Sequence, residues 1–158
     1  MQKYVLVICG RNAGRSQIIQ AFFNELRGHY PTVDSRYEAI SVGTNPGTEI
    51  NPVVTREMRE FKAYLDDPQI YFCKGFGHSY IQSKTEKIER AIVACGESCA
   101  FPPELKSLAD VEHWDLPDPH EASQEEVRRI IRIARDRTID YLSRSETKLL
   151  ENKLSEVH

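Results

Sequence analysis

The sequence predicts a single α/β domain in which a four-stranded parallel sheet is flanked by helices. Three observations carry this prediction. Strand-like apolar runs alternate along the chain with segments of helical periodicity, which is the pattern of parallel strands joined by crossover helices. The first run, residues 4–8, is continuously apolar, as expected of a strand buried on both faces of a sheet. A chain of 158 residues is long enough for one domain with its own core.

The individual elements follow from apolar spacing and from residues that begin or end helices. Gly28 and Pro31 are expected to end the first helix, and Asn51-Pro52 is expected to begin another, with Asn51 as the cap. The predicted strands are residues 4–8, 37–42, 91–94 and 111–114. The predicted helices are residues 16–27, a segment that starts at Asn51-Pro52, residues 79–87 and residues 123–142.

The last predicted helix completes the domain, which we assign to residues 1–142. Residues 143–158 carry Leu149, Leu150 and Leu154 among charged residues, which favours a short helical tail. There are no internal repeats and no low-complexity linker. The inward face of the helix at 123–142 is expected to consist of Val127, Ile130, Ile131, Ala134 and Tyr141.

Composition and charge exclude several classes of protein. A net charge of −3 gives no basic surface for nucleic acid. No apolar run reaches membrane length, and the first strand begins so near Met1 that we expect no cleaved leader. We therefore expect a cytoplasmic protein, and cysteines in a reducing compartment are more often catalytic or metal-binding than structural. The four cysteines, too few for a disulfide scaffold, are Cys9, Cys73, Cys95 and Cys99.

The stretch from Cys9 to Ser16 lies between the first strand and the first helix. In that context the backbone N–H groups of a short loop converge on an anion at a helix N-terminus. These groups and Arg15 favour the thiolate form of Cys9, and the planar guanidinium of Arg15 can take two oxygens of a tetrahedral anion. The candidate oxyanion-binding residues are Gly10, Arg11, Asn12, Ala13, Gly14, Arg15 and Ser16.

Two further candidates, Cys95 and Asp118, also follow predicted strands. Because the carboxyl ends of parallel strands share one edge of a sheet, we expect Cys9, Cys95 and Asp118 on one rim. Asp118 precedes Pro119, which restrains the backbone around it. The proline could hold the Asp118 carboxyl group toward the stretch from Cys9 to Ser16, where it could act as a general acid. The alternative is that Asp118 is only a turn residue.

The pair Cys95 and Cys99 has three interpretations. It could contribute to a metal site, but its spacing is loose for zinc and no second Cys/His pair of typical spacing accompanies it. It could be structural, or it could be a redox dithiol. The histidines show no metal spacing either, so we expect neither a metal nor a cofactor.

The Cys-x5-Arg-Ser motif after the first strand resembles that of the low-molecular-weight protein tyrosine phosphatases and of the arsenate reductases that share their fold. The run from Asn12 to Gln17 and residues 114–119 are closer to the reductases, and Cys-Gly-acidic-x-Cys at 95–99 is similar to the cysteine pair of the thioredoxin-coupled type. The resemblance covers residues 4–142. Residues 62–79 depart from it, and within them the aromatic segment 71–77 is either a lid or, as we favour, a packed loop.

The resemblance implies arsenate reduction. Cys9 would attack arsenate bound in the loop, with Asp118 as the general acid, and Cys95 and Cys99 would relay a disulfide to thioredoxin or a similar dithiol. The alternative is phosphomonoester hydrolysis, which needs only Cys9, Arg15 and Asp118, although His120 and Glu121 replace the aromatics usual in phosphatases. A third hypothesis is a non-catalytic oxyanion-binding or redox-sensing protein.

Overall fold

The central feature of the structure is a four-stranded sheet in which all neighbours are parallel. The computed structural model describes residues 2–95, 103–105 and 107–157. The strand order is β2-β1-β3-β4, and each strand pairs in parallel with its neighbour, which confirms the predicted fold class. The strands are β1 (Lys3–Cys9), β2 (Tyr37–Gly43), β3 (Ile88–Val93) and β4 (Asp110–His113).

The register places the carboxyl ends of the strands together. Cys9 lies opposite Gly43, and Ile8 lies opposite Val93. The chain leaves β1 for β2 on one side and later returns to β3 on the other side. The carboxyl end of β1 is therefore the point where the strand order reverses, which is where ligands bind in open parallel sheets.

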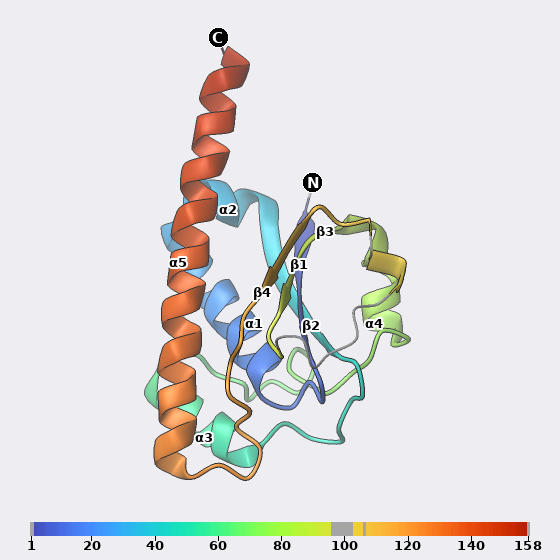
Figure 1. The fold of residues 1–158 in the computed structure, drawn as a ribbon, viewed down its shortest axis with the longest axis vertical. Helices are drawn as coiled ribbons and strands as arrows, with labels where there is room; N and C mark the ends of the chain where they lie inside the picture. Colours follow the sequence, from blue (N-terminus) through green and yellow to red (C-terminus); the bar gives the residue numbers. More distant parts are fainter. Residues whose placement is uncertain (1, 96–102, 106, 158) are drawn as a thin grey trace.

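The helices cover both faces of the sheet (Figure 1). Figure 1 shows α1 and α5 on one side and α4 on the other. None of the helices in the described part of the chain has the length and apolarity needed to cross a membrane. The α-helices are α1 (Arg15–Leu26), α2 (Pro31–Arg36), α3 (Pro52–Glu60), α4 (Ser79–Gln82) and α5 (Gln124–Val157).

Two predicted boundaries are wrong in detail. Pro31 does not only end a helical segment but begins α2, because its fixed φ angle and missing N–H suit the first position of a helix. The segment predicted as one helix at 79–87 consists of α4 and a separate 3₁₀ turn, Thr85–Lys87. The cap at Asn51 is confirmed, since its side-chain oxygen accepts a hydrogen bond from the Val53 N–H at 2.9 Å.

The core confirms the continuous burial expected of the first strand. Every residue of β1 from Val5 to Cys9 is at most 3% exposed. Helix α1 is buried more completely than a surface helix with one apolar stripe, since all residues from Ser16 to Phe23 are buried. The polar residues among them therefore need partners inside the protein.

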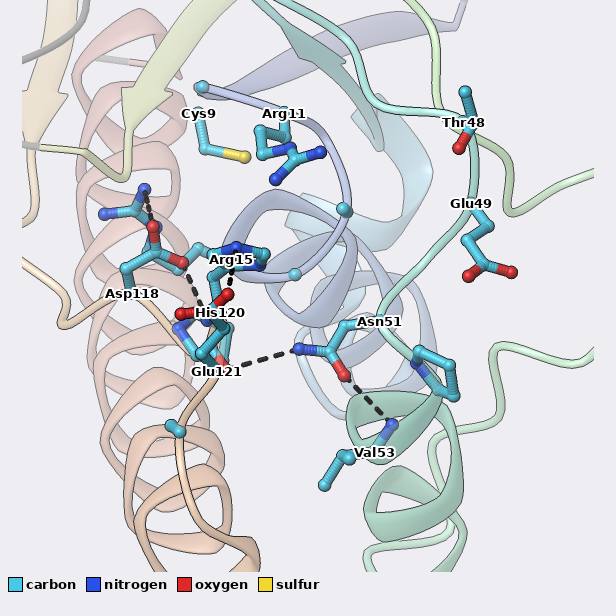
Figure 2. Close-up of a pocket in the computed structure, with 16 residues that line it drawn as sticks. Cys9, Arg11, Arg15, Thr48, Glu49, Asn51, Val53, Asp118, His120 and Glu121 are labelled. Atoms are coloured by element: carbon cyan, nitrogen blue, oxygen red, sulfur yellow. Dashed lines mark hydrogen bonds and ion pairs between the residues drawn. The ribbon is translucent and has the colours of Figure 1, made fainter.

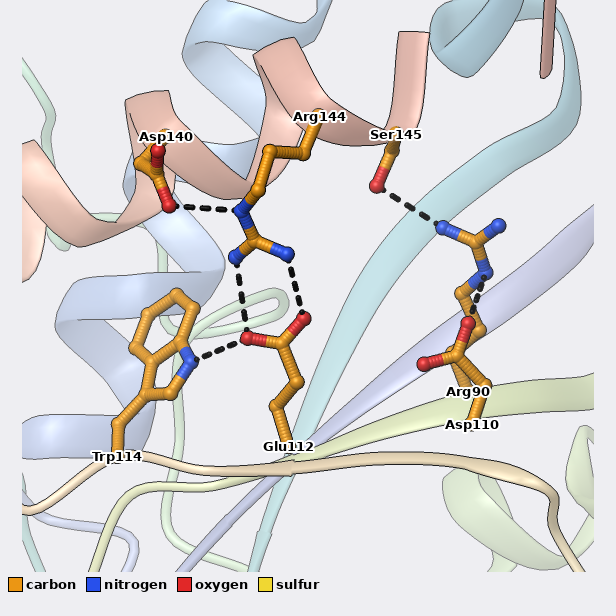
Figure 3. Close-up of polar contacts among 7 residues, drawn as sticks. All are labelled: Arg90, Asp110, Glu112, Trp114, Asp140, Arg144 and Ser145. Atoms are coloured by element: carbon orange, nitrogen blue, oxygen red, sulfur yellow. Dashed lines mark hydrogen bonds and ion pairs between the residues drawn. The ribbon is translucent and has the colours of Figure 1, made fainter. Parts of the chain in front are cut away.

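Helix α5 does not end at Leu142 but continues without a break to Val157, and its C-terminal part extends beyond the sheet (Figure 1). The segment just after Leu142 is tied to β4 (Figure 3). Arg144 donates to both carboxylate oxygens of Glu112 at 3.1 Å, and Glu112 also accepts from the Trp114 indole N–H at 3.1 Å. Ser145 accepts a hydrogen bond from Arg90 at 3.0 Å.

Glu146 and Leu149 extend this attachment further along α5. The Glu146 carboxylate accepts hydrogen bonds from the Thr32 N–H at 2.8 Å and the Val33 N–H at 3.0 Å, at the start of α2. Partial burial raises the pKa of Glu146, but these hydrogen bonds outweigh burial and leave the pKa below its ordinary value. Leu149 is buried, whereas Leu150 and Leu154 are exposed.

We predict that the tail stabilises the domain only as far as Leu149. A chain that ends after Leu142 should lose roughly 3 kcal/mol of unfolding free energy. Burial of Leu149 supplies about 1.5–3 kcal/mol. The hydrogen bonds from the start of α2 to Glu146 act as a helix cap, which supplies about 1 kcal/mol. A chain that ends after Leu150 should unfold within about 0.5 kcal/mol of the full chain. Urea unfolding measures both, and equal losses from the two truncations would contradict this prediction. Turnover per folded molecule should be unchanged in both.

Candidate active site

The loop between β1 and α1, residues 10–14, forms the base of the site, and we call it the anion loop. The carbonyls of the peptides that enter and form the loop, those of residues 9–13, point outward, and each accepts a hydrogen bond from a group outside the loop. The acceptors and their donors are Cys9 O from Thr44 N at 3.0 Å, Gly10 O from Asn45 N at 2.8 Å, Arg11 O from Gly47 N at 2.8 Å, Asn12 O from Gln17 Nε2 at 3.0 Å, and Ala13 O from Asn51 N at 2.8 Å.

This arrangement fixes the direction of the loop N–H groups. In a trans peptide the N–H points opposite to the C=O, and the described residues contain no cis peptide bond. Because the carbonyls of residues 9–13 point outward, the N–H groups of residues 10–14 point into the loop. The loop is therefore a concave set of donors at the N-terminus of α1, which suits a tetrahedral oxyanion.

Two backbone positions make the loop shape possible. Asn12 has a φ angle of 57°, in the left-handed region that asparagine tolerates better than most residues. Gly43, at the end of β2, packs directly against the loop. A Cβ atom there would lie 2.7 Å from Gly10 O and 2.8 Å from Asn12 N, so only glycine leaves room for this approach.

Cys9 is the last residue of β1 before the loop, and the residue is only 3% exposed. Its Sγ lies 2.9 Å from the Ser16 hydroxyl oxygen. Ser16 also accepts a hydrogen bond from Asn12 Nδ2 at 2.7 Å. The hydroxyl hydrogen of Ser16 is therefore free to point at the sulfur, where it can donate a hydrogen bond to it.

The orientation of the Asn12 side chain, on which this argument depends, is set by its surroundings. Its Oδ1 faces the Lys74 backbone N–H at 3.1 Å, and an N–H group can only donate. The amide nitrogen must then face the hydroxyls of Ser16 and Ser41, at 2.7 and 3.1 Å. Ser41 in turn donates to Gln20 Oε1 at 2.5 Å. The buried polar residues of α1 thus form one connected network behind Cys9.

Arg15, the first residue of α1, connects the loop to the segment that follows β4. Its side chain is only 14% exposed. Nη1 donates to Leu116 O at 3.1 Å. Nη2 lies 3.7 Å from an Asp118 carboxylate oxygen, as Figure 2 shows. The guanidinium is thereby held at the mouth of the loop with donors left for an anion.

Asp118 lies on the same rim because the backbone around it is anchored on two sides. Asn51 donates to Pro119 O at 3.2 Å (Figure 2), and Gly14 packs so closely that a Cβ there would lie 2.6 Å from Pro119 Cγ. The Asp118 carboxylate accepts from the His120 N–H at 3.0 Å, and its side chain is 57% exposed. Its exposed position leaves the carboxyl group able to reach a bound anion.

These groups line one open cleft of about 440 Å³. Figure 2 shows Cys9 and Arg15 facing it from the anion loop, and Asp118, His120 and Glu121 from the opposite segment. None of the described residues that line the cleft is a phenylalanine, tyrosine or tryptophan. Its remaining lining residues are Gly10, Arg11, Ala13, Gly14, Thr48, Glu49, Asn51, Pro52, Val53, Pro119 and Ala122.

Cys95 lies at the end of the strand beside Cys9. Its Sγ is 3.9 Å from the carbonyl oxygen of Ile8, and the neighbouring Ala94 N–H donates to the same oxygen at 2.7 Å. Cys95 also forms an isolated bridge with Asp115. The structure therefore places Cys9, Cys95 and Asp118 on the rim expected from the sequence. Cys99 lies outside the described residues.

Some residues that shape the site were not predicted to do so from the sequence, and they lie behind or beside the anion loop. Asn51 was predicted as a helix cap, but it also holds the Asp118 loop and the anion loop. Residues 71–77 form the packed loop that we favoured over a lid. Lys74 is buried, and its carbonyl accepts a hydrogen bond from the Gly43 N–H at 2.8 Å. Residues of 71–77 do not line the cleft. Within the described ranges, no three His, Cys, Asp or Glu side chains gather as a metal site would require.

Several of the known proteins to which this chain is similar are named arsenate reductases. No family model matches the sequence. A putative arsenate reductase of Halobacterium salinarum is 27% identical over 133 residues, which is 84% of this chain and 86% of that protein. A solved arsenate reductase in a phosphate-binding state has a TM-score of 0.71 at 22% identity, covering 90% of this chain and 98% of that one. A thioredoxin-dependent arsenate reductase of Corynebacterium glutamicum has a TM-score of 0.61 at 27% identity, covering 92% of this chain and 62% of that one.

These findings confirm the resemblance inferred from the loop motif. They also agree with the strand order and with the position of the loop at the end of β1. The chain has the fold of the arsenate reductases that resemble low-molecular-weight protein tyrosine phosphatases.

Proposed function

We propose that this protein is an arsenate reductase that converts arsenate to arsenite with a cysteine nucleophile and a dithiol relay. The observation that carries the proposal is a second cysteine beside the first. Cys95 lies within 3.9 Å of the carbonyl of Ile8, the residue before Cys9. Hydrolysis of a phosphate ester has no use for a second thiol, whereas reduction of arsenic requires two electrons from a thiol pair. The curated relative and solved structures named arsenate reductase support this choice.

The shape of the cleft supports a small inorganic substrate. The inward N–H groups of residues 10–14 and the guanidinium of Arg15 supply donors for a tetrahedral anion. The described lining residues include no phenylalanine, tyrosine or tryptophan that would stack on a phenyl ring. The segment after Pro119 offers His120 and Glu121 instead, and the carboxylate of Glu121 disfavours an anionic peptide.

In the first step the Cys9 thiolate attacks arsenic. A sulfur–arsenic bond forms and the bond to one hydroxyl group breaks. Asp118 gives its proton to the departing oxygen, which leaves as water. Arg15 and the loop N–H groups stabilise the charge on the remaining arsenate oxygens.

In the second step the Cys95 thiolate attacks the Cys9 sulfur. The electron pair of the sulfur–arsenic bond passes to arsenic, which is reduced from the +5 to the +3 state and leaves as arsenite. A Cys9–Cys95 disulfide remains. Cys99 then attacks Cys95, which restores the Cys9 thiolate and leaves a Cys95–Cys99 disulfide.

Thioredoxin or a similar dithiol reduces that disulfide with two electrons and two protons and completes the cycle. The relationship to a thioredoxin-dependent reductase supports this partner. Chemistry that ends each cycle on a disulfide needs a reducing compartment, so we propose the cytoplasm as its location.

Phosphomonoester hydrolysis is the second candidate, because Cys9, Arg15 and Asp118 converge on one cleft and would suffice for it. In that reaction water would attack the phosphocysteine, and Cys95 would only be structural. The two candidates therefore differ in what they require of the second thiol.

We predict that Cys95→Ser and Cys99→Ser each abolish thioredoxin-linked arsenate turnover, and that Cys9→Ser abolishes both turnover and any hydrolysis of an aryl phosphate. Hydrolysis should survive the first two changes, because it needs one thiol. Cys73→Ser is the matched control, since Cys73 is a free, half-buried thiol outside the relay, and it should keep full turnover. Arsenate reduction at the full rate by the Cys95/Cys99 double variant would contradict the relay, and a wild type that only hydrolyses esters would establish the second candidate.

We predict that Asp118→Asn separates binding from catalysis. Loss of a general acid should lower kcat for arsenate by about 10²-fold or more. Phosphate affinity should be kept or increased, because the change removes a negative charge 3.7 Å from Arg15 Nη2. Steady-state kinetics and phosphate titration measure the two effects. An unchanged kcat would show that Asp118 only shapes the turn.

A further inference from the structure

Lys74 is a buried cation that the proposed chemistry does not use. The residue is 2% exposed, although lysine is among the residues least often buried. It lies beneath the anion loop and does not line the cleft. In the described part of the chain no carboxylate forms an ion pair with it. Burial of this kind costs free energy, so the contacts of the ammonium group indicate what it does.

Those contacts converge on Asn12. The Lys74 backbone N–H donates to Asn12 Oδ1 at 3.1 Å, and Nζ lies 3.5 Å from the same oxygen. Nζ also donates to Phe72 O at 3.2 Å and lies 4.6 Å from the centre of the Phe72 ring. The ammonium is thus held between an aromatic face and the amide that supports Cys9 through Ser16.

We propose that Lys74 is a positioning residue for Cys9, acting through the amide of Asn12 and the hydroxyl of Ser16. This inference rests on the proposed role of Cys9 as nucleophile. A cation on the amide oxygen of Asn12 polarises the amide, so that Nδ2 donates more strongly to Ser16. Ser16, polarised in turn, donates more strongly to the Cys9 sulfur, because hydrogen bonds in a chain strengthen one another in a low-dielectric interior.

Among the titratable groups around Lys74, the lysine itself is the one whose charge changes just above neutral pH. Burial lowers its pKa to about 8, so the ammonium is charged at neutral pH and loses its proton as the pH rises above that value. Burial raises the pKa of the adjacent Cys73 thiol and of the Tyr80 hydroxyl, whose ring lies 5.6 Å from Nζ, so both stay neutral at pH 7. Support for the thiolate should therefore be strongest below about pH 8.

The test compares Lys74→Met with Lys84→Met. Lys84 is a matched control because its ammonium lies 4.0 Å from the centre of the same Tyr80 ring, yet no described contact joins it to Asn12. We expect Lys74→Met to slow alkylation of Cys9 by iodoacetamide about tenfold at pH 6, followed on the Cys9 peptide by mass spectrometry. The difference should shrink toward pH 9. Lys84→Met should stay within about twofold of the wild type at every pH.

A second pair of variants shows whether the effect passes through the amide. Asn12→Gly removes the amide while tolerating the positive φ angle. Adding Lys74→Met to Asn12→Gly should cause no further slowing, whereas independent effects would multiply. If Lys74→Met does not fold, Lys74→Gln takes its place, because it keeps a hydrogen-bond donor on a side chain one atom shorter, without the charge.

The outcomes separate this inference from the proposed function, because alkylation does not require arsenate reduction. Unchanged alkylation of Cys9 in Lys74→Met, or a loss that is the same at every pH, would overturn the inference and leave the reductase proposal standing. A tenfold, pH-dependent loss in a protein that reduces no arsenate would support the inference and refute the proposed function.

Discussion

The outward direction of the peptide carbonyls from Cys9 to Ala13 is the constraint on which the site depends. Each carbonyl is held by a donor from another part of the chain, and the backbone geometry then turns the N–H groups inward. The donors come from the loop after β2, from α1 itself and from the residue that caps α3. The anion loop is therefore shaped by the tertiary fold rather than by its own sequence, and Gly43 is required because the loop after β2 must approach so closely.

The anion loop has an open side that faces the cleft and a buried side that faces the protein interior, and the two sides have different functions. On the open side Arg15 and Asp118 face the cleft, and Asn51 holds the Asp118 segment against the loop. On the buried side the Asn12 amide connects Ser16 to Ser41 and to the loop around Lys74. The open side would bind and protonate the substrate, whereas the buried side would keep the Cys9 sulfur reactive. Both sides meet at the carboxyl end of β1, beside Cys95.

Much of this arrangement could be predicted from the sequence, and the exceptions have physical reasons. The parallel sheet and the shared rim follow from alternating periodicity and from the position of Cys9, Cys95 and Asp118 after strands. The start of α2 at Pro31 was missed because proline can either end or begin a helix. The roles of Ser41 and Lys74 were missed because their contacts join segments far apart in the chain, and no local pattern indicates a buried lysine. The extension of α5 was predicted as a separate helix because Leu149, Leu150 and Leu154 fit either arrangement.

The claim that a second thiol completes the reaction is tested most directly by trapping the disulfide that the relay requires. Cys99→Ser should stop the relay after its second step, so that one equivalent of arsenate converts Cys9 and Cys95 to a disulfide and releases one equivalent of arsenite. Peptide mapping without reductant identifies the linked cysteines, and phosphate in place of arsenate is the control that should yield none. The relay predicts a Cys9–Cys95 disulfide in nearly every molecule. Free Cys9 and Cys95 after arsenate treatment, or a link from Cys9 to Cys73, would contradict it.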